Sequence, residues 1–311
     1  MTMKQRKSFL RTRMYLKKTW TLYLMLILPI AFAIVFRYIP MTNISMAFKD
    51  YNMFRGVWES PWADPWYKWF AKAFLTKDFW EALRNTLMLN ALDLAFGFPI
   101  PVMLALLLNE LVFKRYKRFT QAVVYLPHFL SWIIISGIAK QLLAPRTGVV
   151  NVFLSSIGVG TVNFLTENHL YVWTYIALGV WKEMGWNTII YLAAITGINP
   201  ELYEAAEVDG ATRFKKIWHV TLPGIRSTII VLLIMNLGRI LGSEFDRPYA
   251  MRNDLVMSVA DVLSTYVYRV GVRGFQFSLT AAVGLFQSVI CVIFLLSANA
   301  IAKKFGERGV L

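Results

Sequence analysis

The sequence predicts an all-α integral membrane protein that crosses the bilayer six times, with both termini on the cytoplasmic side. Three observations predict this class: the composition, the length of the apolar stretches and the distribution of the basic residues. Of the 311 residues, 57% are hydrophobic and 16% are charged, and the mean hydropathy is +0.49. Soluble domains are about a quarter charged, so a purely soluble protein is excluded.

The apolar stretches are long enough for membrane helices. A bilayer core about 30 Å thick needs ~20 apolar residues for each helical crossing. Six stretches reach this length: Trp20–Ile39, Leu83–Leu108, Gln121–Leu143, Leu170–Thr196, Gly224–Leu241 and Leu279–Ile301. The first resembles a signal peptide, because basic residues precede it and Ala31-Phe32-Ala33 mimics a cleavage site. Its apolar residues continue to Ile39, so we expect a retained membrane anchor.

The basic residues define the orientation of these spans. The N-terminus, the second-to-third and fourth-to-fifth loops and the C-terminus together carry 18 Lys and Arg and six Asp and Glu. Their net charge is therefore +12 out of +15 for the whole chain. Because Lys and Arg accumulate in cytoplasmic loops, we expect these segments in the cytoplasm. The basic charge is then a topology signal, and no nucleic-acid partner is expected.

We expect three parts in the chain. Residues 1–19 form a basic cytoplasmic segment, residues 20–303 form the six-span domain, and residues 304–311 form a cytoplasmic tail. The single cysteine, Cys291, excludes an internal disulfide, and the three histidines lack the spacing of metal ligands.

An outer segment, Pro40–Ala82, is rich in tryptophan and holds five of the eleven in the chain. Two interpretations remain open for it. Either these residues form an aromatic belt at the membrane interface, or they form an outer surface that packs against a partner or passes a sugar ring along.

The cytoplasmic loop at residues 199–223, between the fourth and fifth spans, predicts two short helices. Asn199 is a favourable N-cap, Pro200 suits the first helical position, and Asp209-Gly210 ends the first helix in a left-handed turn. The second helix leads into the fifth span. One interpretation is a plain interfacial connector. The other is a docking element, because small residues beside a carboxylate let another protein approach closely.

The spacing in this loop resembles a known motif. Glu204-Ala205-Ala206 is followed after three residues by Gly210, and after nine more by Val220-Thr-Leu-Pro223. This resembles the EAA motif of the membrane permease subunits of ATP-binding-cassette (ABC) importers, with Val220 in place of the usual isoleucine. Segments at 37–41, 47–51, 98–110, 126–132, 180–187 and 305–309 are similar to polysaccharide-type sugar permeases related to the maltose permeases.

The resemblance implies a type I ABC importer permease fold with a cytoplasmic coupling helix. It assigns docking on an ATPase to five residues of the loop: Glu204, Ala205, Ala206, Asp209 and Gly210. It implies four kinds of partner besides membrane lipid: a cytoplasmic ABC ATPase dimer, a second homologous permease subunit, an extracytoplasmic solute-binding protein and an oligosaccharide substrate. The expected location is a bacterial cytoplasmic membrane.

Motifs for catalysis do not occur in the chain. It lacks a G-x-x-x-x-G-K-[S/T] phosphate loop and the G-x-S-x-G and H-E-x-x-H motifs. We therefore expect no enzyme activity and no cofactor bound by this chain, with ATP and Mg²⁺ on the partner ATPase.

Ionisable residues inside the spans are candidates for the transport pathway, because an unpaired charge in hydrocarbon is costly. They are Asp93 in the second span and Lys182 and Glu183 in the fourth. They either hold helices together or line the pathway. As a proton relay, they would alternatively serve an ion- or proton-coupled secondary transporter, although six spans without an inverted repeat argue against that class. A structural membrane scaffold is a third class.

Candidate sugar contacts lie on the spans that flank the loop. Aromatic rings stack on sugars and amides bind their hydroxyls, which selects Trp186, Asn187 and Tyr191 on the fourth span. On the fifth span Asn236, Arg239 and Ser243 share one helical face by their spacing. Arginines in the outer half hint at an acidic oligosaccharide such as a uronate oligomer, while neighbouring acidic residues also allow ordinary salt pairing.

Overall fold

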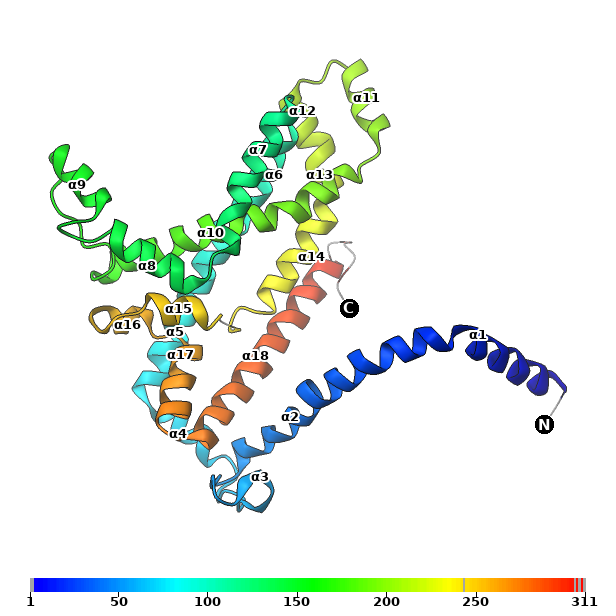
Figure 1. The fold of residues 1–311 in the computed structure, drawn as a ribbon, viewed down its shortest axis with the longest axis vertical. Coiled ribbons are helices and arrows are strands. Elements are labelled where there is room, and N and C mark those ends of the chain that lie inside the picture. Colours follow the sequence, from blue (N-terminus) through cyan, green and yellow to red (C-terminus); the bar gives the residue numbers. More distant parts are fainter. Residues whose placement is uncertain (1–2, 243, 305, 307–308, 310–311) are drawn as a thin grey trace.

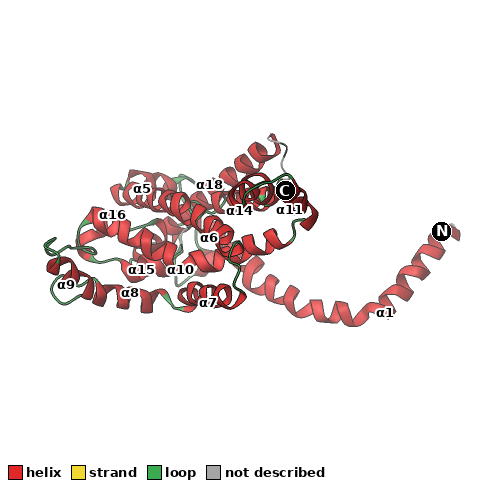
Figure 2. Cartoon of the chain, turned by 90° about the horizontal axis from the view of Figure 1, so that it is seen from above, coloured by secondary structure: helices red, strands yellow, loops and turns green. Residues whose placement is uncertain are grey.

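The computed structural model describes residues 3–242, 244–304, 306 and 309. Within these residues the chain is helical and forms no strand, apart from isolated bridges between Lys49 and Trp62 and between Asn52 and Gly56. The all-α prediction is confirmed. Figure 1 shows a body of packed helices from which α1 (Met3–Ala33) extends as an arm, and the view from above shows the same separation (Figure 2).

The other helices follow in chain order. The α-helices are α2 (Ile39–Met41), α3 (Gly56–Glu59), α4 (Lys68–Leu75), α5 (Lys77–Leu92), α6 (Pro99–Asn109), α7 (Lys114–Tyr125), α8 (Trp132–Leu142), α9 (Val149–Ser156), α10 (Asn168–Thr196), α11 (Pro200–Val208), α12 (Arg213–Lys216), α13 (Leu222–Gly224), α14 (Arg226–Leu237), α15 (Asp246–Met251), α16 (Met257–Ala260), α17 (Leu263–Val267) and α18 (Phe277–Lys304). The π-helical turns are η1 (Ile34–Tyr38), η3 (Asp93–Gly97), η5 (Ile217–Thr221) and η7 (Tyr268–Arg273). The 3₁₀ turns are η2 (Thr42–Phe48), η4 (Leu126–Phe129) and η6 (Asp254–Val256).

Three helical segments are long and apolar enough to cross a membrane: Lys18–Phe48, Lys77–Asn109 and Phe277–Lys304. Three bent pairs raise the number to six if each pair is one span: Lys114–Phe129 with Trp132–Leu142, Arg213–Gly224 with Arg226–Leu237, and Asp254–Ala260 with Leu263–Arg273. Six crossings are therefore the upper count among the described residues, in agreement with the predicted number.

The structure corrects the predicted spans in two places. The third predicted span is not one straight helix, because α7 and α8 meet at 101°. Pro127 lies in the break, and the Ser131 hydroxyl caps α8 by accepting from the Ile134 N–H at 3.3 Å. The helix of the fifth predicted span ends at Leu237, and residues 238–241 form turns instead of helix.

The candidate spans selected by length and composition are not the same six segments as those predicted. The fourth predicted span forms α10, which is 29 residues long but is not among the helices apolar enough to cross by composition. Lys182, Glu183 and Asn187 lower its hydropathy. Conversely, the pair formed by Asp254–Ala260 and Leu263–Arg273 counts as a candidate span, whereas the sequence placed it outside the membrane.

The second span contains an irregular turn that positions a charge. Its helix runs from α5 into the π-helical turn η3 and on into α6. Pro99 and Pro101 have no N–H to donate to η3, so the regular hydrogen-bond ladder cannot continue through this point. Asp93, the first residue of η3, therefore sits where the helix changes its winding.

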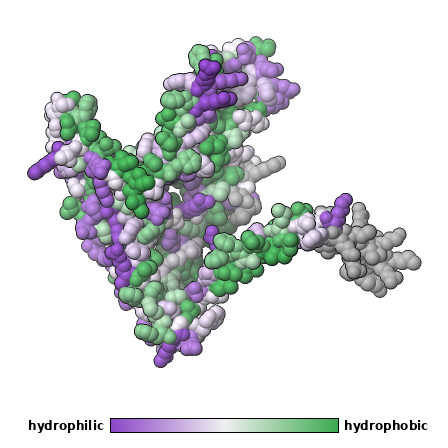
Figure 3. Space-filling model, viewed as in Figure 1, coloured by the Kyte–Doolittle hydropathy of each residue, from purple (hydrophilic) through white to green (hydrophobic). Residues whose placement is uncertain are grey.

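The body and the arm are packed very differently. Three clusters of buried apolar residues fill the body, around Tyr171 and Trp132, around Phe79 and Tyr266, and around Tyr191 and Ile225. In contrast, the most apolar part of the segment Lys18–Phe48 is 0% buried. Figure 3 shows the hydrophobic surface of this arm, and hydrophilic side chains gathered at the end of the body that carries α11 and α12.

Candidate functional sites: the loop after α10 and a cavity in the body

The loop between α10 and α14 forms the two predicted short helices. The Asn199 side chain caps α11 by accepting from the Glu201 N–H at 3.1 Å. At the other end Gly210 adopts φ +71°, which favours glycine. The Gly210 N–H donates to the Glu207 carbonyl at 3.0 Å and the Ala211 N–H donates to the Ala206 carbonyl at 2.8 Å. These two bonds form a Schellman motif, so the predicted helix end is confirmed.

Helix α11 presents a small, exposed face. Glu204 and Ala205 are exposed and Ala206 is half-buried. Glu204 makes no ion pair with the side chains of residues 18–242 and 244–304. Asp209 and Gly210 are exposed as well, at the helix end. The five residues assigned to docking therefore lie together at one tip of the body, accessible to another protein (Figure 1).

Two side-chain contacts attach α11 to the helix that leads into α14. The Tyr203 hydroxyl lies 3.0 Å from the hydroxyl of buried Thr221, at the end of η5. The Lys216 ammonium pairs with Glu207 at 3.0 Å. A force on α11 would thus reach η5 and α14 through short side-chain contacts rather than through a flexible loop.

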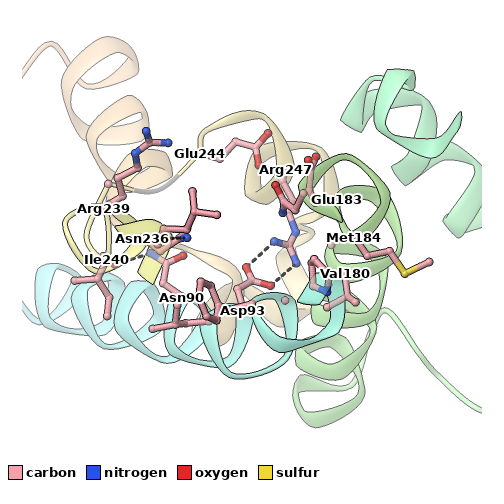
Figure 4. Close-up of a pocket in the computed structure, with 18 of the residues that line it drawn as sticks. Asn90, Asp93, Val180, Glu183, Met184, Asn236, Arg239, Ile240, Glu244 and Arg247 are labelled. Carbon is pink, nitrogen blue, oxygen red and sulfur yellow. Dashed lines mark hydrogen bonds and ion pairs between the residues drawn. The ribbon is translucent and has the colours of Figure 1, made fainter. Parts of the chain in front are cut away.

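A cavity of about 420 Å³ lies in the middle of the body. It is bounded by α5, η3 and α6, by α10, by α14 and by the segment between α14 and α15 (Figure 4). Its polar lining consists of Asn90, Asp93, Glu183, Asn187, Tyr175, Tyr191, Asn236, Arg239, Glu244 and Arg247. Amides, hydroxyls, carboxylates and guanidinium groups thus alternate with apolar side chains, as in sites for polar solutes.

A buried ion pair forms part of the cavity wall. Arg247 of α15 donates to both oxygens of Asp93, at 2.6 Å from Nη1 and 3.1 Å from Nη2 (Figure 4). Nη2 also donates to the Tyr175 carbonyl at 2.6 Å, and the guanidinium lies 3.7 Å above the Tyr175 ring. Gly179 makes this approach possible, because a Cβ there would lie 2.7 Å from Nη1 and overlap the rest of the guanidinium.

A second polar network lies beside this pair. Lys182 donates to the His128 carbonyl at 2.8 Å and to Glu183 at 3.0 Å, and His128 Nδ1 lies 2.9 Å from the other Glu183 oxygen. Trp132 donates from its indole nitrogen to Glu244 at 2.6 Å. The cations of Lys182 and Arg247 lie 5.4 and 5.2 Å from the Trp132 ring, so this buried indole separates the two networks.

Only some of the residues predicted to contact sugar line the cavity. Asn187, Tyr191, Asn236 and Arg239 line the cavity. Trp186 does not line it, because its ring stacks on His128 with centroids 4.5 Å apart. Ser243 lies outside the described residues. Asn236 and Arg239 line the same cavity, but the helix predicted to carry them on one face ends at Leu237, and Arg239 follows in a turn.

The three predicted intramembrane charges do not form one network. Asp93 pairs with Arg247, whereas Lys182 and Glu183 are neighbours that pair with each other and with His128. Asp93 and Glu183 line the cavity, and Lys182 is buried beside it. Sequence reasoning missed the roles of Arg247, Trp132 and Gly179. A buried carboxylate at Asp93 implies a cationic partner, but nothing in the local sequence identifies one that is 154 residues away.

Comparison with known proteins gives a consistent result. The family model described as "Binding-protein-dependent transport system inner membrane component" matches residues 97–307. Protein LplB of Bacillus subtilis is 45% identical over 95% of this chain and 92% of its own length. The polygalacturonan/rhamnogalacturonan transport system permease protein YteP of Bacillus subtilis is 43% identical over 93% of this chain and 89% of its own length.

Two solved structures are also similar. One is a chain of a bacterial ABC transporter involved in the import of the acidic polysaccharide alginate. It is 41% identical with a TM-score of 0.85, over 94% of this chain and 99% of that chain. The other comes from a bacterial alginate ABC transporter in complex with a periplasmic protein that holds an alginate pentasaccharide. It is 42% identical with a TM-score of 0.86, over 95% of this chain and 98% of that chain.

Proposed function

The chain belongs to the family of inner membrane components of binding-protein-dependent transport systems, and we propose that it imports an acidic oligosaccharide. It is the permease subunit of a sugar ABC importer and not an enzyme, because in this family a separate subunit hydrolyses ATP. The family thus favours ATP-driven transport over the proton-coupled alternative. Uronate oligomers are the acidic sugars that the similar proteins support most directly.

One observation about the cavity supports an anionic cargo: the Arg239 side chain has no partner among the described residues. Among the residues lining the described cavity, each carboxylate already has a donor: Arg247 for Asp93, Lys182 for Glu183, and Trp132 for Glu244. Arg239 also lines the cavity but makes no ion pair or side-chain hydrogen bond within the described parts of the chain. A planar guanidinium without a partner suits the fork of a sugar carboxylate.

Neutral parts of a sugar have partners in the same cavity. Asn90, Asn187 and Asn236 offer amides, and Tyr191 offers an aromatic ring beside them. Amide groups bind sugar hydroxyls in either direction because each carries both donors and an acceptor. Among the described residues, the cavity therefore combines the unpaired guanidinium of Arg239 with hydroxyl-binding groups, which suits the chemistry of a uronic acid.

The exposed surfaces support the partners of such a subunit. Helix α11, with Glu204, Ala205, Ala206, Asp209 and Gly210, supports docking of a cytoplasmic ABC ATPase dimer that carries the ATP and Mg²⁺. The apolar arm formed by α1, whose most apolar part is 0% buried in this chain, supports a second permease subunit that covers it. An extracytoplasmic solute-binding protein would deliver the cargo. Both termini then lie in the cytoplasm of a bacterial cell, on the basic side of its cytoplasmic membrane.

The test of the cargo is uptake by the assembled transporter, with its binding protein at saturating concentration. We expect Arg239→Gln to lower the initial uptake rate of a labelled galacturonate trisaccharide about tenfold, the loss expected for one charge-assisted hydrogen bond. Uptake of the carboxyl-reduced, neutral trisaccharide is expected to stay unchanged. Arg146→Gln, on the exposed loop before α9, is the matched control. Equal effects of Arg239→Gln on both sugars would contradict an anionic cargo held by Arg239.

A further inference from the structure

The two partners of the buried ion pair are held to very different degrees. Arg247 is only 8% exposed and has three contacts besides Asp93: the Tyr175 carbonyl, the Tyr175 ring and the Trp132 ring. These contacts hold the guanidinium against α10 and Trp132 in addition to the ion pair. Asp93 is 27% exposed, lines the cavity and bonds through its side chain only to Arg247 within the described residues.

The backbone around the two residues shows the same asymmetry. Arg247 passes through a notch that exists only because residue 179 is a glycine, with the backbone of α10 on one side. Asp93 starts the π-helical turn η3, and π turns in helices are less regular and are common at functional sites. The arginine is therefore the fixed member of the pair and the aspartate is the replaceable one.

These observations suggest what replaces the aspartate. We propose that Arg247 is a second receptor for the carboxylate of the cargo, masked by Asp93 while the transporter is empty. A uronic-acid carboxylate has the same two-oxygen fork as Asp93 and can accept the same two N–H groups. Asp93 acts as an internal stand-in, because a buried guanidinium without a counter-charge is strongly unfavourable. This inference rests on the proposed acidic cargo.

The other charges of the cavity do not compete for this role. Glu183 is engaged by Lys182 and His128, and Glu244 accepts from the Trp132 indole. Arg239 would bind a first carboxylate directly, since it has no internal partner in the described chain. An oligosaccharide with carboxylates on successive sugar rings would then be distinguished from one with a single carboxylate. Only the former has a second carboxylate that can displace Asp93 from Arg247.

Two conservative variants separate this role from a purely structural ion pair. The measurement is equilibrium binding of a galacturonate trisaccharide to the purified assembled transporter without its binding protein. Asp93→Asn removes the competitor and is expected to lower the Kd about tenfold, whereas Arg247→Lys loses the fork and is expected to raise it about tenfold. Neither variant is expected to change binding of the carboxyl-reduced trisaccharide.

The chain offers a matched control on the same helix. Asp78 of α5 pairs with Arg269 at 3.3 Å, away from the cavity and more exposed than Asp93 and Arg247. Asp78→Asn and Arg269→Lys are expected to leave binding of both trisaccharides unchanged.

Each outcome decides the proposal. If Asp93→Asn lowers and Arg247→Lys raises the Kd of the anionic trisaccharide, and neither changes the Kd of the neutral one, the masked receptor is supported. Parallel losses for both sugars, or no shift in either variant, overturn it and leave the acidic cargo intact. A wild-type transporter that imports the neutral trisaccharide and rejects the anionic one would overturn the acidic cargo and the receptor together. If the Asp93→Asn transporter does not assemble, the Arg247→Lys variant decides the question. Its affinity for the anionic trisaccharide, relative to its affinity for the carboxyl-reduced one, must fall for the proposal to hold.

Discussion

Helix α11 and the central cavity are built in opposite ways. The residues that we propose for docking, from Glu204 to Gly210, lie close together in the chain and nearly all are exposed. Those of the cavity come from segments more than 150 residues apart, as the pair of Asp93 and Arg247 shows. The helix depends on its cap, its terminal glycine and two short ties, while the cavity depends on the packing of at least four segments.

This difference determines which substitutions should disrupt helix α11 and which should disrupt the cavity. Helix α11 is contiguous and exposed, so it should lose its structure when its own backbone can no longer adopt the required conformation, since few other contacts support it. An element assembled from distant segments fails when any of its packing contacts is altered, because buried charges tolerate few positions. Four substitutions test this contrast, and those expected to cause the greatest loss come first.

Gly210→Pro is expected to abolish transport while the protein still inserts in the membrane. Proline holds φ near −65°, whereas Gly210 has φ +71°, and proline lacks the N–H that bonds to the Glu207 carbonyl. The turn that ends helix α11 would then not form, and the exposed face proposed for docking would be distorted. Glu204→Lys, which reverses the charge of that face, is expected to act in the same direction. The measurements are sugar uptake and co-purification of the ATPase subunit.

The control for this prediction is Gly158→Pro. Gly158 also has a positive φ, +83°, and its N–H also donates to a carbonyl, that of Ser155, but it lies in the loop after α9. We expect this variant to transport normally. Normal uptake by a well-expressed Gly210→Pro protein would refute the docking role of α11.

Gly179→Ala is expected to damage the cavity without touching α11. The added Cβ overlaps the Arg247 guanidinium, so either Arg247 leaves Asp93 or α10 moves. Overpacking of this kind destabilises a protein by about 1–3 kcal/mol. We expect a lower melting temperature of the purified transporter and a large loss of uptake. Gly284→Ala in α18 is the control, because nothing lies within 4 Å of its added Cβ. Equal melting temperatures of the two variants would argue against a tight notch.

Tyr203→Phe is expected to give the smallest effect, because it removes a single hydrogen bond to Thr221. One such bond contributes about 1 kcal/mol, which corresponds to a change of about fivefold. We expect a loss of this size in the ratio of sugar-stimulated to basal ATPase activity of the assembled transporter, since α11 would be tied less firmly to η5. Tyr116→Phe, at an exposed position of α7, is the control. An unchanged ratio would mean that the force passes through the backbone or through Glu207 and Lys216 alone.

Helix α11 itself could be predicted from the sequence nearly in full. Asn199, Pro200 and Gly210 act on the backbone within a few residues of themselves, so capping and turn preferences were sufficient to find both ends of α11. The spans could be predicted in number but not in shape. The composition of Gln121–Leu143 indicated one span, yet the bend of 101° between α7 and α8 arises where Pro127 interrupts the ladder.

The cavity could be predicted only in part. Composition selected Asn187, Tyr191, Asn236 and Arg239, which do line it, and also Trp186, which stacks on His128 instead. A stacking partner for an aromatic ring is chosen by the whole fold, and the sequence does not contain that information locally.

The all-α membrane class, the family motif and the two ends of helix α11 could be inferred from the amino-acid sequence alone, because apolar length, charge sorting and capping are local properties of the chain. The contact of Arg247 with Asp93 through the notch at Gly179 depends instead on how the helices pack. The same packing leaves Arg239 without a partner in the described cavity. The physical reason is that the state of a buried charge depends on which groups surround it, and that is settled when segments far apart in the chain pack together.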